Sequence, residues 1–401
     1  MKRILCAALC VLAIAVPTGA SAAEIGSVYP YDAVADEFWG INVPAVAEYV
    51  PDGDAKALLL MEFSTGRVLF AENETAHLPI ASVTKVISTL LIAEALDSGK
   101  ITLEDEVTVS ERAASMGGSQ VFLEPGERMS VHDLLKALVV VSANDATVAL
   151  GEYVYGSEDS FIAAMNARAA ELGCENSNFV NTNGLPAEGH YSCALDVAVV
   201  TRELMKHEFI FGFTGIWMDT IRNGTFGLAN TNKLIRFYKG ATGMKTGFTS
   251  EAGYCLSGTA TRDGMSLIAV VLGGSTSKLR FAAAKGLLDY GFANYRVFSP
   301  EPPVIEPAAV THGTLPQAAL ETPRVALLCE KSAAADNVQA KVEVAESIAA
   351  PVEPGTEVGV VRYYIGGTEV ASAPVLTAAA VPRVTYFSLL LSVLRSAFAF
   401  L

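Results

Sequence analysis

The first two thirds of the chain carry short hydrophobic runs typical of strands and longer ones typical of helices. Ala57–Phe63 and Arg67–Ala71 are apolar runs joined by a short polar stretch, which predicts a hairpin with Gly66 in its turn. The segment 82–98 is apolar on nearly all faces and is followed by Gly99. We therefore expect a buried helix that ends at this glycine and runs through the middle of a domain.

A second group of elements is predicted just before residue 299. Gly253–Thr261 and Met265–Leu272 are two strand-like runs joined by Arg262-Asp263-Gly264, a favourable turn sequence. The pattern of Ser277–Tyr295 is that of a helix. Together with the early hairpin, these elements predict an antiparallel sheet with helices packed on it.

A proline-rich segment divides the chain into two regions. Residues 299–307 read Ser-Pro-Glu-Pro-Pro-Val-Ile-Glu-Pro, which is typical of a stiff, extended linker. At 401 residues the chain is also too long for one hydrophobic core of usual size. We expect a mixed α/β (α+β) domain over 43–298 and a small β-rich domain over 308–380. The strands predicted in the second domain are Val325–Cys329, Ala340–Val344, Val358–Ile365 and Thr368–Ala371.

Both ends of the chain have sequences that indicate export and membrane binding. A charged start, an apolar run over Ile4–Val16 and a small-residue stretch predict a signal peptide over residues 1–22. In Val384–Leu401, polar or small residues recur every three to four positions among large apolar ones, which predicts an amphipathic helix in the membrane interface. Two alternatives are a short membrane-spanning helix, since 18 residues reach about 27 Å, and a helix docked on the core.

Charge and cysteine spacing exclude several functions. The formal net charge is -15 without a basic stripe, so binding to nucleic acid is not expected. No two cysteines form a C-x-x-C pair, so neither a zinc site nor a redox motif is predicted, and we expect no metal and no cofactor. A disulfide between Cys174 and Cys193 is compatible with an oxidising compartment, but their spacing does not establish it.

Three short motifs follow one another in the chain: Ser82-Val83-Thr84-Lys85, Ser142-Ala143-Asn144 and Lys245-Thr246-Gly247. Taken singly, they also fit a helix N-cap, a turn and a solvated strand residue. A second S-x-x-K occurs at Ser275–Lys278, but it follows the K-T-G and does not complete the set in order. The order S-x-x-K, S-x-N, K-T-G is that of the serine acyl-transferases that use a lysine base.

The residue types of the first two motifs suit nucleophilic catalysis without histidine. Ser82 and Lys85 are three residues apart on one helical face, so the amine reaches the hydroxyl. A lysine held in a dry site beside a second cation has a lowered pKa and serves as a general base. Ser142 is expected to pass the proton toward the leaving amine, and Asn144 to hydrogen-bond an amide of the substrate.

The third motif suits the recognition of a terminal carboxylate. Lys245 offers a positive charge and Thr246 a hydroxyl group to a carboxylate. Gly247, without a side chain, allows the strand backbone to lie close beside a bound substrate.

The chain resembles the serine-type D-alanyl-D-alanine carboxypeptidases, the low-molecular-mass penicillin-binding proteins of the peptidase S11 type. The resemblance extends over essentially the whole length and includes the words around the motifs. They are Pro79-Ile80-Ala81-Ser82-Val83-Thr84-Lys85, Val141-Ser142-Ala143-Asn144-Asp145-Ala146, Asn181-Thr182-Asn183-Gly184-Leu185-Pro186 and Gly243-Met244-Lys245-Thr246-Gly247-Phe248-Thr249. It implies a penicillin-recognising, β-lactamase-like domain in which an antiparallel sheet is flanked by helices beside an all-helical lobe. A β-rich C-terminal domain and a terminal anchor helix follow.

The resemblance also implies the reaction. Ser82 would attack the penultimate D-alanine carbonyl of a peptidoglycan stem pentapeptide, release the terminal D-alanine, and lose its acyl group to water. β-Lactams would acylate the same serine. By resemblance, the oxyanion hole consists of the backbone N–H groups of Ser82 and Phe248. Phe248 stands where some relatives have histidine, which leaves the fine substrate preference open. The enzyme would be exported and act at the outer face of the cell membrane.

Three other functions remain as alternatives. A serine β-lactamase shares the fold and motifs, but no Glu-x-x-Leu-Asn word lies between Asn144 and Lys245. A catalytically idle wall-binding protein would not need every motif residue that is present here. A Ser-His-Asp hydrolase would need a G-x-S-x-G word, which the chain lacks, so we interpret its histidines as structural or surface residues.

Overall fold

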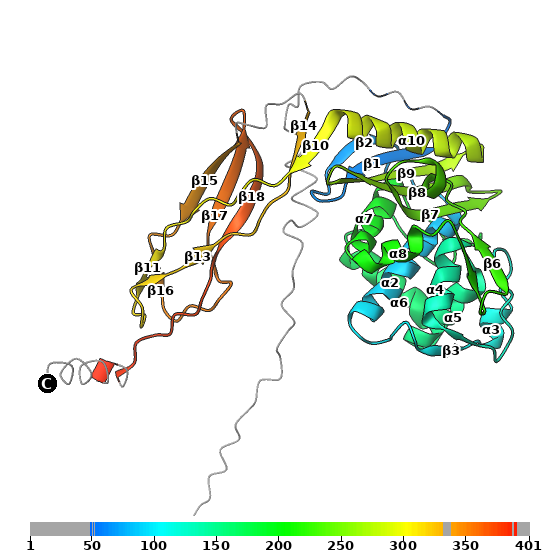
Figure 1. The fold of residues 1–401 in the computed structure, drawn as a ribbon, viewed down its shortest axis with the longest axis horizontal. Coiled ribbons are helices and arrows are strands. Elements are labelled where there is room, and N and C mark those ends of the chain that lie inside the picture. Colours follow the sequence, from blue (N-terminus) through cyan, green and yellow to red (C-terminus); the bar gives the residue numbers. More distant parts are fainter. Residues whose placement is uncertain (1–48, 50, 52, 332–337, 387–388, 391–401) are drawn as a thin grey trace, which may run out of the picture. The chain divides into compact units, whose positions relative to one another are not determined.

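A five-stranded antiparallel sheet forms the centre of the first domain (Figure 1). The computed structural model describes residues 49, 51, 53–331, 338–386 and 389–390. The strand order is β2-β1-β9-β8-β7, so the predicted early hairpin and the two later predicted strands are confirmed. The bounds are β1 Ala57–Glu62, β2 Val68–Glu72, β7 Ala241–Thr249, β8 Gly253–Arg262 and β9 Met265–Gly274.

Both faces of this sheet are covered by helices, which explains its continuous apolar strands. In β1, Leu59 and Met61 face one hydrophobic core, while Leu58 and Leu60 face another. Successive side chains of a strand point to opposite faces, so a strand that is buried on both sides needs apolar residues at every position. The helix α10 (Ser277–Asn294) packs on one face, and α7 (Ala194–Met205) lies on the opposite face (Figure 1).

The chain between β2 and β7 forms a mainly helical region. Its centre is α2 (Lys85–Asp97), which is buried on almost every side. The predicted helix over 82–98 therefore begins three residues later than expected, because residues Ala81–Thr84 form a 3-10 turn, η2. The other helices are α3 Glu111–Ala114, α4 Val131–Val140, α5 Asn144–Tyr155, α6 Glu158–Glu171, η3 Glu208–Ile210, α8 Phe211–Thr214 and α9 Leu234–Phe237. Two small hairpins pair β3 Glu106–Thr108 with β4 Arg128–Ser130, and β5 Met218–Ile221 with β6 Phe226–Ala229.

Between residues 308 and 377 the regular structure of the described chain consists of strands, as predicted. A four-stranded sheet has the order β13-β18-β17-β15, and a three-stranded sheet the order β12-β11-β16. The buried Tyr363 lies in the small core of the larger sheet. The bounds are β11 Ala308–Thr311, β12 Gln317–Ala318, β13 Leu320–Glu321, β15 Val338–Val344, β16 Ser347–Ala349, β17 Glu357–Ile365 and β18 Thr368–Thr377. A further pair joins β10 Tyr295–Phe298 to β14 Leu327–Glu330.

Several predictions concern parts of the chain that the structure describes little or not at all. The signal peptide over residues 1–22 and most of the anchor helix over 384–401 lie outside the described residues. Among the helices that are described, none has the length and hydropathy needed to cross a membrane. Cys174 and Cys193 are both buried and both free, so this structure contains no bridge between them.

Candidate active site

Ser82 lies in the 3-10 turn that directly precedes α2. The residue before it, Ala81, has φ of +48°, a left-handed conformation that is rare and strained for a residue with a side chain. In a 3-10 turn, residues three apart are aligned along the axis, so Ser82 and Lys85 face the same side. Lys85 Nζ lies 3.2 Å from Ser82 Oγ. The predicted contact between the serine and the lysine is therefore present.

The amine of Lys85 is fully buried and fixed by two further contacts. Nζ donates to Asn144 Oδ1 at 2.6 Å and to the carbonyl oxygen of Asn183 at 2.9 Å. Burial lowers the pKa of Lys85 well below its ordinary value, the nearby charge of Lys245 lowers it further, and Asp145 opposes the shift. The neutral amine, which is the form that accepts a proton, is thus favoured.

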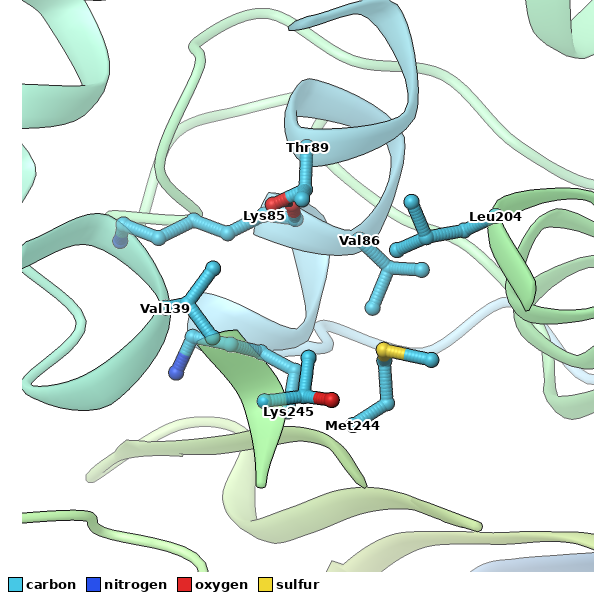
Figure 2. A pocket seen from close by; sticks show the side chains of 8 residues that line it. Lys85, Val86, Thr89, Val139, Leu204, Met244 and Lys245 are labelled. Atoms are coloured by element: carbon cyan, nitrogen blue, oxygen red, sulfur yellow. Dashed lines mark hydrogen bonds between the residues drawn. The ribbon is translucent and has the colours of Figure 1, made fainter. Parts of the chain in front are cut away.

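A small cavity lies behind the two lysines. Figure 2 shows the side chains of Lys85 and Lys245 extending to the same side, while apolar side chains and two threonines line the remaining wall. The stems of both lysines are therefore packed within the protein, in keeping with the burial that lowers both pKa values. The lining residues are Lys85, Val86, Thr89, Val139, Leu204, Thr214, Met244 and Lys245.

The second motif forms the tight turn between α4 and α5. Ser142 has φ of +64° and is 4% exposed, and its Oγ has no hydrogen-bond partner within the described chain. A buried hydroxyl without a partner is uncommon and is consistent with a group that bonds to a ligand. Asn144 begins α5 and contacts protein groups, since Oδ1 accepts from Lys85 and Nδ2 donates to the Gly117 carbonyl at 2.6 Å. Its contact with a substrate amide stays a prediction.

The third motif lies on β7, the edge strand beside the turn that carries Ser82. Lys245 is 4% exposed and Nζ donates to its neighbour's carbonyl, that of Thr246, at 2.9 Å. Burial and the charge of Arg280 lower the pKa of Lys245 to about 7. Phe248 is exposed and packs on Tyr254, with ring centroids 4.3 Å apart.

Gly247 is required by the protein's own packing as well as by the predicted approach of a substrate. A Cβ at this position would lie 2.8 Å from the Ile80 carbonyl oxygen and 3.0 Å from the Ser82 nitrogen. The bare backbone therefore lets β7 lie directly against the turn that carries Ser82. Arg280, on α10, also fixes this part of β7, because its Nη1 donates to the Gly247 carbonyl at 3.1 Å.

Sequence reasoning missed the loop that closes one side of the site. In the loop 181–185, the Asn183 carbonyl accepts from Lys85, and a Cβ at Gly184 would overlap the carbonyl oxygen of Ala81. His190 fastens this region to the first motif, since Nε2 lies 2.8 Å from Thr84 Oγ1 while Nδ1 accepts from the Val180 N–H. The Asn-Thr-Asn-Gly word was a signal for the loop, but neither His190 nor Arg280 carried one.

The arrangement is suited to transferring an acyl group to a serine. A half-buried hydroxyl lies beside a buried amine whose pKa is lowered, with an unpartnered hydroxyl on the adjacent turn. A lysine and a threonine are presented on the neighbouring strand. Ser82, Lys85, Ser142, Asn144, Lys245, Thr246 and Gly247, which the sequence predicted as the site, thus come from elements that pack around one point.

Comparison with protein families matches both domains. Residues 44–276 match the family described as D-alanyl-D-alanine carboxypeptidase. Residues 300–383 match the family described as penicillin-binding protein 5, C-terminal domain.

Individual relatives agree with these matches. The chain is 43% identical over 328 residues to D-alanyl-D-alanine carboxypeptidase DacF of Bacillus subtilis, covering 80% of this chain and 84% of the relative. It is 33% identical to D-alanyl-D-alanine carboxypeptidase DacC of Escherichia coli, over 81% of this chain and 84% of the relative. Among solved structures, penicillin binding protein 5 from Haemophilus influenzae is 31% identical with a TM-score of 0.75, covering 84% of this chain and 100% of that chain.

Proposed function

The chain belongs to the D-alanyl-D-alanine carboxypeptidase family of penicillin-binding proteins, and from this we propose that its reaction proceeds through an acyl-enzyme on Ser82. The family and its relatives favour a serine carboxypeptidase of the cell envelope over the alternative of a β-lactamase. The substrate is a peptidoglycan stem pentapeptide that ends in D-alanyl-D-alanine. The observation that carries the proposal is the 3.2 Å contact between Lys85 Nζ and Ser82 Oγ in a buried site.

In the first step, Lys85 is the general base. Its neutral amine removes the proton of Ser82 as Oγ attacks the penultimate D-alanine carbonyl. The lowered pKa of Lys85, caused first by burial and then by the charge of Lys245, supports this role because it favours the neutral form over the ammonium. The backbone N–H groups of Ser82 and Phe248 bind the developing oxyanion, and the close packing of β7 on the nucleophile turn supports their pairing.

The leaving D-alanine then needs a proton and its carboxylate needs a partner. Ser142 relays the proton to the leaving amine, a role that its unpartnered and buried Oγ supports. Lys245 and Thr246 bind the carboxylate of the terminal D-alanine. Gly247 leaves room beside the strand, and Asn144 orients the Lys85 amine and a substrate amide. Water finally hydrolyses the acyl-enzyme.

β-Lactams are expected to acylate the same serine, since a related protein has been solved with two such ligands bound. Penicillin-Binding Protein D2 from Listeria monocytogenes was solved in its ampicillin-bound form, at 31% identity and a TM-score of 0.55 over 59% of this chain and 97% of that chain. Its cefotaxime-bound form is similar to this chain to the same degree. Bound drug in a relative supports, for this chain, the use of benzylpenicillin as a probe.

The test is intact-protein mass measured over time after mixing with benzylpenicillin. A penicilloyl adduct that lasts for minutes is expected in the parent chain and not in Ser82→Ala. Ser275→Ala is a matched control because it alters the serine of the other S-x-x-K in the sequence, and it should form the adduct normally. Rapid drug hydrolysis without an adduct would indicate a β-lactamase instead, and an adduct in Ser82→Ala would exclude Ser82 as the nucleophile.

We also propose how the chain is divided and held at the membrane. Residues 43–298 form the catalytic domain, 299–307 the linker and 308–380 the C-terminal domain; the lack of helix or strand over 299–307 supports this division. Residues 384–401 bind the outer face of the cell membrane as an amphipathic helix after the signal peptide, 1–22, has been removed. Flotation with anionic vesicles should recover the full mature chain but not a chain ending at Arg383; equal recovery would refute the anchor.

A further inference from the structure

A short segment outside the three motifs contacts the hydroxyl group of Thr246. Residues 230–232 read Asn-Thr-Asn and lie between β6 and α9. The two asparagines are buried, 8% exposed at Asn230 and 2% at Asn232, whereas Thr231 between them is exposed. Thr231 Oγ1 lies 2.6 Å from Thr246 Oγ1, and Thr246 itself is 6% exposed. The two hydroxyls therefore form a pair, one inside the wall of the site and one at its surface.

The backbone of this segment is fixed by contacts to the two elements that carry the later motifs. The Thr231 N–H donates to the Val140 carbonyl at 3.2 Å, at the end of α4 and two residues before Ser142. Asn232 Nδ2 donates to the Gly243 carbonyl on β7 at 2.7 Å. Asn230 Nδ2 donates to the Ile216 carbonyl, in the segment before β5, at 2.6 Å. These bonds determine where the Thr231 side chain points.

The number of protons in the pair limits which of the two hydroxyls can donate to the other. A threonine hydroxyl has one proton to donate and two lone pairs that accept. If Thr246 donates its proton to Thr231, it has none left for a carboxylate. If Thr231 donates instead, the Thr246 proton is free to bind an anion, and the exposed Thr231 oxygen accepts from water. Only the second arrangement suits a subsite that binds a carboxylate.

We propose that Thr231 is a positioning residue of the carboxylate subsite. Thr231 donates its proton to Thr246 and so directs the Thr246 O–H toward the substrate carboxylate. This inference rests on the proposed function, because it requires that Thr246 binds the carboxylate. It assigns to Thr231 a share in the preference for substrates with a free carboxyl terminus. A substrate or inhibitor with a neutral group at this position gains less from the pair, because a hydrogen bond to a carboxylate is stronger than one to a neutral acceptor.

The test compares a charged and a neutral ligand in variants that remove single hydroxyls. The second-order acylation rate is measured with benzylpenicillin and with its methyl ester, which lacks the carboxylate charge. In Thr231→Val, the rate with benzylpenicillin should fall about three- to tenfold, as expected for one hydrogen bond. The rate with the ester, whose neutral carbonyl accepts a weaker hydrogen bond, should fall less. Thr231→Ser, which restores a hydroxyl, should recover most of the loss.

A matched control exists on the same strand. Thr242 Oγ1 lies 2.8 Å from Thr259 Oγ1, so Thr242→Val removes one member of a similar hydroxyl pair outside the three motifs. Thr242→Val should leave unchanged the ratio of the acylation rate with benzylpenicillin to the rate with its methyl ester. Equal slowing of both ligands by Thr231→Val, or loss of the ratio in Thr242→Val as well, would mean a general structural effect and would overturn the inference.

A further variant separates this inference from the proposed function. Thr246→Val should reduce the ratio of the two rates at least as much as Thr231→Val, and the double variant should add little to it. If Thr246→Val leaves the ratio unchanged, the carboxylate subsite itself is wrong and the inference fails with it. If Thr246→Val lowers the ratio and Thr231→Val does not, the proposed subsite stands and only the inference is refuted.

Discussion

Replacing Gly184 by alanine should disturb Lys85, the proposed general base, although the two residues are not neighbours in the sequence. Gly184 has φ of +84°, and an added Cβ would overlap the Ala81 carbonyl oxygen and lie 2.8 Å from Thr84 Oγ1. Neither obstacle is the end of a flexible side chain, so the loop 181–185 must move away from the first motif. That movement takes the Asn183 carbonyl away from Lys85 Nζ, from which it now accepts at 2.9 Å.

The size of the effect follows from two contributions. An alanine in the left-handed region costs about 1–2 kcal/mol, and forcing extra volume into a packed contact costs about 1–3 kcal/mol more. A shift of about 1 Å between reacting groups reduces rates by roughly 100-fold. We therefore expect Gly184→Ala to lose about 2–5 kcal/mol of unfolding free energy and to be acylated by benzylpenicillin roughly 100 times more slowly.

Gly189 provides the matched control. Its φ is +77°, so an alanine there has similar backbone strain, but the nearest atom to an added Cβ is Asn178 Nδ2 at 3.6 Å, an ordinary contact. Gly189→Ala should lose only about 1–2 kcal/mol and keep its acylation rate within about twofold. Urea unfolding and intact-mass kinetics on the parent chain, Gly184→Ala and Gly189→Ala test these two expectations. If Gly184→Ala is acylated as fast as Gly189→Ala, the loop does not position Lys85.

Two further predictions concern pH. Burial lowers the pKa of His190 to about 4, whereas the unfolded chain binds this proton near pH 6.5. The free energy of unfolding should therefore fall by about 3 kcal/mol as the pH drops from 6.5 toward 4. His190→Gln should lose this part of the pH dependence in urea unfolding, and an unchanged pH dependence would contradict the prediction. The pKa of about 7 at Lys245 predicts that kcat/KM falls as pH rises through 7, because the cation binds the carboxylate. In Arg280→Gln, which removes the neighbouring positive charge, this alkaline limb should move to higher pH, and a limb that stays in place would show that another group titrates.

The sequence predicted several of the longer elements and the motif residues for physical reasons that can be named, whereas the helices α4 to α7 were not predicted individually. β1, β8 and β9 carry enough apolar residues to be recognised, and α2 is apolar on nearly every face. The strands that were missed are short: β12 and β13 have two residues each. So few residues do not display a repeating pattern.

The parts of the site that were missed depend on contacts between distant segments. The Asn183 carbonyl is a backbone group, so its bond to Lys85 leaves no mark on residue type. Arg280 lies in a helix like any surface arginine, and its burial against Gly247 follows from how α10 packs on the sheet. The position of Ser82 in a 3-10 turn instead of an α-helix depends on the left-handed Ala81, where the sequence has no glycine to indicate it.

The strand order also determines how much of the chain must be present before the active site can form. β1 lies between β2 and β9, and Ala57 pairs with Leu272, 215 residues later (272 minus 57). Until β9 has joined it, β1 has only its hairpin partner, and an isolated hairpin is marginally stable at best. Ser82 follows the hairpin of β1 and β2 in the chain, whereas Lys245 lies on β7, which joins the sheet through β8 and β9. An exported chain should therefore acquire the ability to bind penicillin in one step, when β9 closes the sheet.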